Sequence, residues 1–168
     1  MPLPGEFRLP LALLGMAGAA VLTVSVAGAV QDRPHDPQDI AWHSAQQAYL
    51  AGLKAADGWQ PVAGGLKWRR VSGDGSGPRP SADDTVTVHY TGRFIDGQVF
   101  DSSVERGEPA TFPLGGLVKA WQLAIPQMGV GDTIEIAAPA DLAYGPKGRG
   151  PIPGGATLLF TVELRGIE

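Results

Sequence analysis

The spacing of hydrophobic and polar residues changes twice along this chain. Residues 9 to 30 are apolar or small almost throughout and carry no charge. From residue 39, apolar side chains recur at the three- and four-residue spacing of a helix. From residue 65 onward they occur in short runs with the two-residue period of strands. The pattern predicts a targeting segment over 1–30, a tether with a helix over 31–64, and a strand-rich domain over 65–168.

The apolar N-terminal segment predicts export. Ala27-Gly28-Ala29 fits a small-x-small cleavage site, which favours a periplasmic or secreted mature chain. The apolar run also approaches the roughly 20 residues that a helix needs to span a bilayer. An uncleaved single-pass inner-membrane anchor is therefore the alternative. In either case, contact with a membrane is expected only through this segment.

Residues 31 to 38 include two prolines and predict an extended tether. Asp39 predicts the N-cap of a helix that continues to about Ala56. The expected apolar stripe of this helix is weakly hydrophobic and consists of Ile40, Ala45, Ala48, Tyr49, Gly52, Leu53 and Ala56. We expect the helix to pack on its own domain, with a weak homodimer through this helix as the alternative.

Short strands separated by turn residues predict a sheet. Between residues 84 and 90, Val86, Val88 and Tyr90 alternate with polar residues and share one face. The dipeptide Asp96-Gly97 predicts a hairpin with a two-residue turn. Further strands are expected at 66–71, 111–114, 133–138 and 157–165.

A short helix is expected among these strands, from Leu117 to Ile125, where Pro126 ends it. The pattern predicts no other helix after Gly65. Strands on both sides of such a helix are typical of an α+β fold. We therefore expect an antiparallel sheet of about five strands wrapped over one short helix, with an N-terminal helical extension. A Gly/Pro-rich loop at 143–155 is expected before the last strand.

The composition excludes several classes of function. The chain has no cysteine and only three scattered histidines, so neither a metal nor another cofactor is expected. Its 13 basic and 17 acidic residues are mixed along the sequence, which leaves no basic stripe for nucleic acid. The glycine-rich stretch at 72–78 has the wrong spacing for a phosphate loop and is expected to be a turn.

Several motifs remain after these exclusions. They are Val-His-Tyr-Thr-Gly at 88–92, Gly-Gln-Val-Phe-Asp-Ser-Ser at 97–103, Lys-Ala-Trp at 119–121, Gln-Met-Gly-Val-Gly-Asp at 127–132, Ala-Tyr-Gly at 143–145, and Ile-Pro-Gly-Gly-Ala-Thr-Leu-Leu-Phe at 152–160. Together they resemble the FKBP-type peptidyl-prolyl cis-trans isomerases, the tacrolimus-binding immunophilin family, over residues 65–168. Ala-Thr-Phe-Pro-Leu at 110–114, with the preceding helix, resembles the bacterial macrophage infectivity potentiator branch, whose members are often exported.

The resemblance implies an apolar pocket with Trp121 as its floor. The implied catalytic residues are Tyr90, Phe100, Asp101, Trp121 and Tyr144. The implied substrate-binding residues are Phe112, Leu117, Val118, Ile152 and Phe160. In the family, the hydroxyl at the Tyr144 position and the backbone N–H at the Ile152 position hold substrate carbonyl oxygens, while Asp101 pairs with Tyr90.

The implied activity is faster rotation of X-Pro bonds in proline-containing polypeptides, with tacrolimus-like macrolides as inhibitors. Rotation passes a barrier close to the roughly 18–20 kcal/mol of an ordinary peptide bond. A dry pocket disfavours the planar, charge-separated amide more than the twisted one, so neither a covalent step nor a cofactor is needed. The alternatives are a non-enzymatic peptide-binding chaperone and a structural envelope domain on the same fold. His89 is expected on the strand face opposite Tyr90, as a solvated residue.

The chain departs from the family pattern in three places. Ala110 stands where an aromatic ring is frequent, which widens that wall. The segment between Leu114 and Trp121 is shorter than in small human-type members, and Gly154 follows Pro153 where a second proline is common. These differences are expected to change substrate preference and inhibitor affinity.

Overall fold

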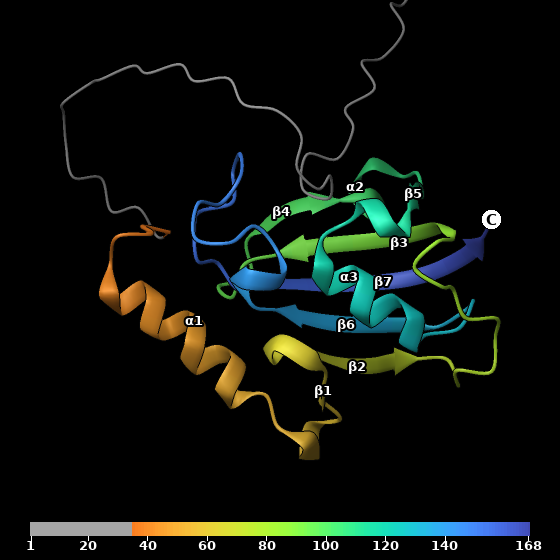
Figure 1. Cartoon of the computed structure of the whole chain (residues 1–168), viewed down its shortest axis with the longest axis horizontal. Helices are drawn as coiled ribbons and strands as arrows, with labels where there is room; N and C mark the ends of the chain where they lie inside the picture. Colours follow the sequence, from red (N-terminus) through yellow and green to blue (C-terminus); the bar gives the residue numbers. More distant parts are fainter. Residues whose placement is uncertain (1–34) are drawn as a thin grey trace, which may run out of the picture.

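A seven-stranded sheet dominates residues 35–168, which are the residues that the computed structural model describes (Figure 1). Its strand order is β1-β2-β6-β7-β3-β4, with β5 also paired to β3, and all neighbours are antiparallel. The strands are β1 Gln60–Pro61, β2 Lys67–Ser72, β3 Thr85–Arg93, β4 Val99–Ser102, β5 Ala110–Pro113, β6 Thr133–Ala138 and β7 Leu158–Ile167. The predicted α+β class with an antiparallel sheet is confirmed.

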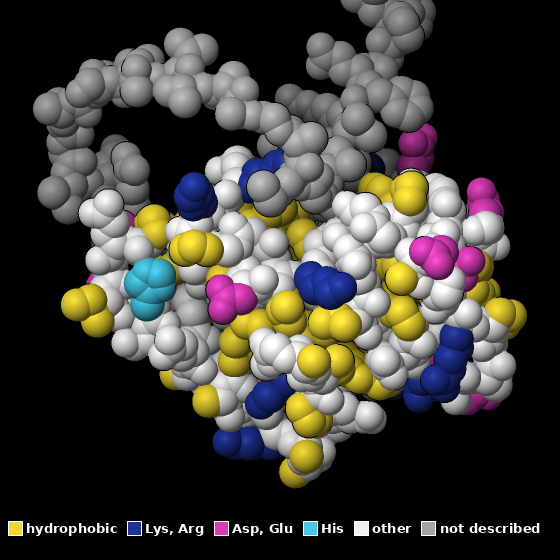
Figure 2. Space-filling model, viewed as in Figure 1, with side chains coloured by type: hydrophobic (Ala, Val, Ile, Leu, Met, Phe, Trp, Pro, Cys, Tyr) yellow, Lys and Arg dark blue, Asp and Glu magenta, His cyan; other side chains and the backbone are white. Residues whose placement is uncertain are grey.

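Helices occupy both sides of this sheet. The α-helices are α1 Ile40–Gly52, α2 Ser103–Arg106 and α3 Lys119–Ala124. Short 3-10 helices are η1 Ala55–Asp57, η2 Ala63–Gly65, η3 Leu114–Gly116, η4 Ile125–Gln127 and η5 Ala140–Leu142. Helix α3 crosses one face of the sheet (Figure 1). Figure 2 shows the same side of the molecule, where hydrophobic side chains gather over the middle and charges of both signs lie among them.

The core lies between α3 and the sheet. In β3, the predicted alternation is confirmed, because Val86, Val88 and Tyr90 are buried while the residues between them are partly exposed. Strands β6 and β7 add inward side chains such as Ile136 and Phe160. Because side chains alternate across a strand, the same strands present a second row of side chains to the opposite face.

Two short elements escaped the sequence prediction. Strand β1 has two residues and α2 has four, so neither is long enough to show a period. Strand β1 adds to the number of strands beyond the expected five or so, and α2 is a second α-helix after Gly65. The predicted helix over 117–125 is shorter as an α-helix, and Pro126 lies in the 3-10 turn that follows it.

The hairpin at Asp96-Gly97 is present, but its connection is longer than two residues. Strand β3 ends at Arg93 and β4 begins at Val99. The N–H of Gly97 donates to the Phe94 carbonyl at 3.0 Å and closes the turn. The connection is therefore not the predicted two-residue turn. The register of β3 and β4 also shifts between Gly92 and Arg93, so the pairing of the two strands is irregular there.

Helix α1 begins as predicted, since Asp39 accepts a hydrogen bond from the Ala41 N–H at 2.8 Å. It ends at Gly52 instead of near Ala56. The ammonium of Lys67 donates to the carbonyls of Leu50 and Leu53, each at 2.7 Å. These bonds satisfy carbonyls that a helix terminus leaves free, so the chain turns away there.

The predicted apolar stripe of α1 is wrong for most of its members. Ile40 is 82% exposed, and the alanines of the stripe are exposed too. The buried residues are Trp42 and Gln46. Toward the C-terminal end, Tyr49 and Leu53 pack on a small cluster on the sheet face opposite α3, made of Trp59, Ala137 and Leu159. The expectation that the helix packs on its own domain is confirmed.

The predicted targeting segment over 1–30 lies outside the described residues. Of the predicted tether, the described part from residue 35 forms a turn rather than an extended spacer, because the Asp39 N–H donates to the Asp36 carbonyl at 3.1 Å. Within residues 35–168, no helix has both the length and the apolar character needed to cross a membrane.

Candidate active site

Aromatic rings from four strands and α3 meet on the inner side of the sheet. The Trp121 ring is fully buried and lies edge to face with Tyr90 and Phe160, at centroid distances of 5.3 and 5.5 Å. Phe100 lies 5.9 Å from Phe160, and Phe112 lies 6.3 Å from Tyr90. Such pairs contribute about 0.5–1.5 kcal/mol each beyond burial, so the rings hold one another without a ligand.

Phe94 extends this cluster at the hairpin and was not among the predicted site residues. Its ring is 4% exposed and lies 5.1 Å from that of Phe100. The sequence indicated only a turn here, because Phe94 directly precedes Ile95-Asp96-Gly97. Phe94 directly follows the last residue of β3.

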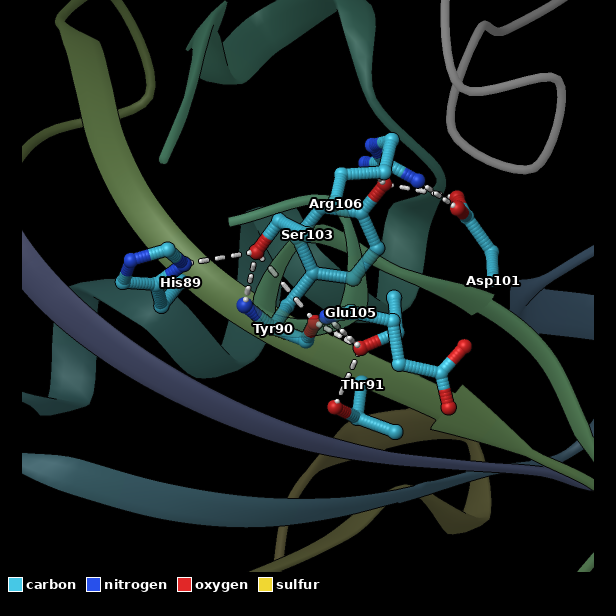
Figure 3. Close-up of polar contacts among 8 residues, drawn as sticks. His89, Tyr90, Thr91, Asp101, Ser103, Glu105 and Arg106 are labelled. Carbon is cyan, nitrogen blue, oxygen red and sulfur yellow. Dashed lines mark hydrogen bonds and ion pairs between the residues drawn. The ribbon is translucent and has the colours of Figure 1, made fainter. Parts of the chain in front are cut away.

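A polar network closes one edge of the aromatic cluster (Figure 3). The Tyr90 hydroxyl donates to Oδ2 of Asp101 at 2.6 Å. The Arg106 guanidinium donates to Oδ1 of Asp101 and, at 2.9 Å, to the Tyr90 hydroxyl. The Asp101 side chain is only 9% exposed, so Arg106 supplies the charge that a buried carboxylate requires.

Arg106 is a site residue that the sequence analysis missed. It is the last residue of α2, whose N-cap Ser102 accepts a hydrogen bond from the Glu105 N–H. Ser102 followed three residues later by Glu105 is a capping-box pattern, which predicts a helix start. That signal places Arg106 one turn further on, although it does not reveal that the side chain folds back onto Asp101.

Burial is the main cause of the raised pKa of Tyr90. The hydrogen bond to Asp101 raises this pKa further, while Arg106 lowers it without cancelling the rise. The phenol therefore stays neutral and acts as a hydrogen-bond donor at physiological pH.

Tyr144 lies in the loop after η5 and packs against the core. Its hydroxyl is buried and has no hydrogen-bond partner among residues 35–168. Desolvation raises the pKa of this phenol; Arg149 lowers it and Asp101 raises it. An unpaired buried hydroxyl costs about 1–3 kcal/mol, and such groups call for an explanation in a folded protein. The indole N–H of Trp121 is also buried and unpaired within the described residues.

The N–H of Ile152 is already engaged. It donates to the Arg149 carbonyl at 2.9 Å, while the Arg149 N–H donates to the Ile152 carbonyl at 2.8 Å. Ile152 is 3% exposed and belongs to the core, as do Leu117 and Val118. The structure thus brings the predicted residues together but leaves this donor bonded within its own loop.

His89 lies on the face of β3 opposite Tyr90, as expected, but it is partly buried and hydrogen-bonded instead of being a solvated residue. Its Nδ1 is 3.0 Å from the Ser103 hydroxyl oxygen, which also accepts a hydrogen bond from the Tyr90 N–H at 2.8 Å (Figure 3). The imidazole therefore supports the backbone of β3 and does not reach the Tyr90 hydroxyl.

A separate cavity of about 290 Å³ lies where α1 meets the sheet. It is lined by Tyr49, Leu53, Asp57, Trp59, Arg69, Arg93, Glu135, Ile136, Leu159 and Phe160. Three of its charged groups pair with one another, because Glu135 lies 2.6 Å from Arg69 and 3.1 Å from Arg93. We therefore assign the candidate site to the aromatic cluster, where the Tyr144 hydroxyl and the Trp121 indole N–H have no hydrogen-bond partner among residues 35–168. Within residues 35–168, no group of three or more His, Cys, Asp or Glu residues is arranged to hold a metal ion.

Comparison with known proteins identifies relatives of two kinds. FKBP-type peptidyl-prolyl cis-trans isomerase FkpA of Aeromonas hydrophila is 45% identical over 122 residues, which are 73% of this chain and 45% of that protein. Outer membrane protein MIP of Legionella longbeachae is 41% identical over 122 residues, 72% of this chain and 52% of that protein. FK506-binding protein 1 of Candida glabrata is 45% identical over 109 residues, 62% of this chain and 95% of that protein.

The chain thus spans about half the length of the bacterial relatives that it matches. Among solved structures, a crystal structure of a peptidyl-prolyl cis-trans isomerase from Pseudomonas syringae pv. tomato superposes with a TM-score of 0.69 at 33% identity. The match covers 76% of this chain and 94% of that one. A family model for FKBP-type peptidyl-prolyl cis-trans isomerase matches residues 77–165, more than half of the 168 residues. The chain belongs to the FKBP-type peptidyl-prolyl cis-trans isomerase family.

Proposed function

We propose that this protein catalyses the cis-trans isomerisation of X-Pro bonds in exported polypeptides. The observation that carries the proposal is the buried hydroxyl of Tyr144, which lies beside the aromatic cluster and has no hydrogen-bond partner among residues 35–168. A hydroxyl that costs stability when it is unpaired is accounted for if a substrate carbonyl becomes its acceptor.

The aromatic rings and the Tyr144 hydroxyl have separate roles in this proposal. Trp121 and Phe160 supply apolar contact for a proline ring and exclude water, which raises the free energy of the planar, more polar amide. Tyr144 donates to a carbonyl oxygen of the bound peptide and fixes its orientation. Arg106 neutralises Asp101, so the polar edge presents no net charge to the amide.

The test measures cis-trans exchange in a proline tetrapeptide with the full chain in solution. We expect the exchange rate to rise in proportion to protein concentration, and a tacrolimus-like macrolide to abolish the increase. An exchange rate that does not change at micromolar protein contradicts the proposal. The expectation that a macrolide inhibits the protein rests on the name of the Candida glabrata relative, an FK506-binding protein.

A second candidate function is a peptide-binding chaperone without efficient turnover. The observation that favours it is the N–H of Ile152, which is bonded to the Arg149 carbonyl and does not face a ligand as a free donor. Peptide binding without faster exchange supports the chaperone, whereas binding with faster exchange supports the isomerase.

The export part of the proposal rests on the apolar segment at 9–30 and on the name of the Legionella longbeachae relative, an outer membrane protein. We propose cleavage near Ala29, with retention as an inner-membrane anchor as the alternative. N-terminal sequencing of the protein from an envelope fraction distinguishes the two: a start near Val30 supports cleavage, and an intact apolar run supports the anchor.

A further inference from the structure

Helix α1 precedes the family match at 77–165, yet it touches the loop that carries Tyr144. Figure 1 shows the N-terminal half of α1 beside the chain that leads into β7. Two contacts join them, one through Gln46 and one through Gly155. Both contacts lie at the end of the loop, just before β7 begins.

Gln46 is 5% exposed in the middle of α1. Its Oε1 accepts a hydrogen bond from the N–H of Thr157 at 2.9 Å, and its backbone carbonyl accepts one from the Thr157 hydroxyl at 3.4 Å. Thr157 is 2% exposed and directly precedes β7. A buried amide is tolerated only when it is hydrogen-bonded, so this two-point contact defines how α1 and the loop meet.

Gly155 lies against the same helix. A Cβ on Gly155 would come within 2.5 Å of Cε1 of His43, and its φ is +80°, so the position requires glycine. His43 is itself held, since its Nε2 lies 2.7 Å from the Pro37 carbonyl oxygen. The N–H of Gly155 then donates to the Gly145 carbonyl at 2.9 Å, next to Tyr144.

This series of contacts runs from α1 through Gly155 and Gly145 to Tyr144. It matters because the Tyr144 hydroxyl has no partner among residues 35–168, so no hydrogen bond within that range orients it. Its position depends on the backbone of its loop. A displacement of about 1 Å in a group that orients substrate can reduce a rate about 100-fold.

We propose that Gln46 is a positioning residue for the isomerase site: by holding Thr157, it fixes the loop that presents Tyr144 to the substrate. The inference rests on the proposed isomerase function. It assigns to α1 a direct part in the activity of the domain, beyond its contribution to the stability of the fold.

The experiment uses the full chain with Gln46→Leu, which removes the acceptor at similar volume. The matched control is Gln47→Leu, the neighbouring glutamine on the exposed face of α1. Two quantities are measured: kcat and KM with a proline tetrapeptide, and amide hydrogen exchange of peptides from the loop at 143–157 and from β3, without substrate.

We expect Gln46→Leu to lower kcat by at least about tenfold and to speed exchange in the loop by a similar factor, with β3 unchanged. Gln47→Leu should match the wild type in both measurements. Exchange that rises equally in the loop and in β3 overturns the proposal, because it indicates loss of stability alone. Unchanged loop exchange with unchanged kcat overturns it as well.

The two measurements also separate this inference from the proposed function. A wild-type protein without isomerase activity contradicts the proposed function, while loop exchange still tests whether Gln46 holds the loop. If Gln46→Leu does not fold, Gln46→Asn tests the same contact, because asparagine keeps the amide but its shorter side chain withdraws the acceptor from the Thr157 N–H. A Gln46→Asn protein with wild-type loop exchange and kcat overturns the proposal.

Discussion

Gly92 in β3 lies beneath the ring of Phe100 in β4. A Cβ on Gly92 would come within 2.6 Å of Cζ of Phe100 and 3.1 Å of Cε1 of Phe160. The first of these distances is shorter than real Cβ atoms show, so a side chain at this position would displace the Phe100 ring. The last residue of the Val-His-Tyr-Thr-Gly motif therefore has a steric role in the aromatic cluster.

Gly92→Ala should displace the Phe100 ring and open the cluster to water. We expect a loss of stability of about 1–3 kcal/mol, as for other overpacked cores, and a clear loss of isomerase activity. Urea unfolding and the tetrapeptide assay measure the two effects. Gly52→Ala is the control, because a Cβ on Gly52 meets nothing within 4 Å. Full activity in Gly92→Ala contradicts the assignment of Phe100 to the pocket wall.

Arg106→Ala should destabilise the fold by about 1–3 kcal/mol, because it leaves the buried Asp101 carboxylate with one hydrogen-bond partner fewer and removes the cation that pairs with it. The control is Arg165→Ala. Arg165 forms a 3.8 Å ion pair with Glu163 in which both side chains are more than 40% exposed, and such pairs contribute only about 0–1 kcal/mol. Equal losses of stability in the two variants would show that the Arg106 network is no stronger than a surface pair.

Tyr144→Phe removes a buried hydroxyl that has no partner among residues 35–168. We expect the free energy of unfolding to stay equal or to rise, since no protein hydrogen bond is lost. The value of kcat/KM should fall about tenfold, as expected for one hydrogen bond to a substrate carbonyl of roughly 1.4 kcal/mol. Lower stability with normal kcat/KM is the opposite pattern, and it would remove Tyr144 from the site.

The activity should be nearly constant between roughly pH 6 and 8. Burial raises the pKa of Tyr90 and of Tyr144, so both phenols stay neutral over that interval. We expect His89→Gln to keep most of the activity, because His89 contacts Ser103 outside the cluster. Phe100→Ala should lose most of it. A pH-dependent step in the activity that disappears in His89→Gln would instead assign acid-base chemistry to that histidine.

Asp132 should make stability depend on pH in acid. Burial acts to raise the pKa of its carboxyl, but hydrogen bonds from the N–H groups of Gly129 and Gly75, with Arg70 nearby, lower it below 3.8. A carboxyl whose pKa is lower in the folded than in the unfolded state stabilises the fold at pH values above its unfolded pKa. This stability is lost as the pH falls through its folded pKa. The difference between wild type and Asp132→Asn in urea should therefore shrink below about pH 4. A difference independent of pH down to pH 2 contradicts this role.

Local patterns were enough to predict much of this protein. The alternation of Val86, Val88 and Tyr90 predicted the buried face of β3, because side-chain direction in a strand depends only on sequence position. The cap at Asp39 depends on contacts within two residues and was predicted as well. The motifs around Tyr90, Trp121 and Tyr144 were sufficient for the family.

The end of α1 and its buried face were decided only by the tertiary structure. Its partners are far away in sequence, since Gln46 meets Thr157 across 111 positions and Lys67 reaches back to Leu50. A weak apolar stripe on a single helix carries no information about such partners. For the same reason, the sequence indicated the exposed alanines instead of Trp42 and Gln46.

At the candidate site the division is similar. The motifs in the sequence implied, through their resemblance to the family, most residues of the aromatic cluster, although Phe94 was missed. Tertiary structure alone decided that Arg106 folds onto Asp101 and that the Ile152 N–H bonds to Arg149. The physical reason is that a hydrogen bond depends on the direction and separation of two groups in space, and neither is contained in the spacing of residues along the chain.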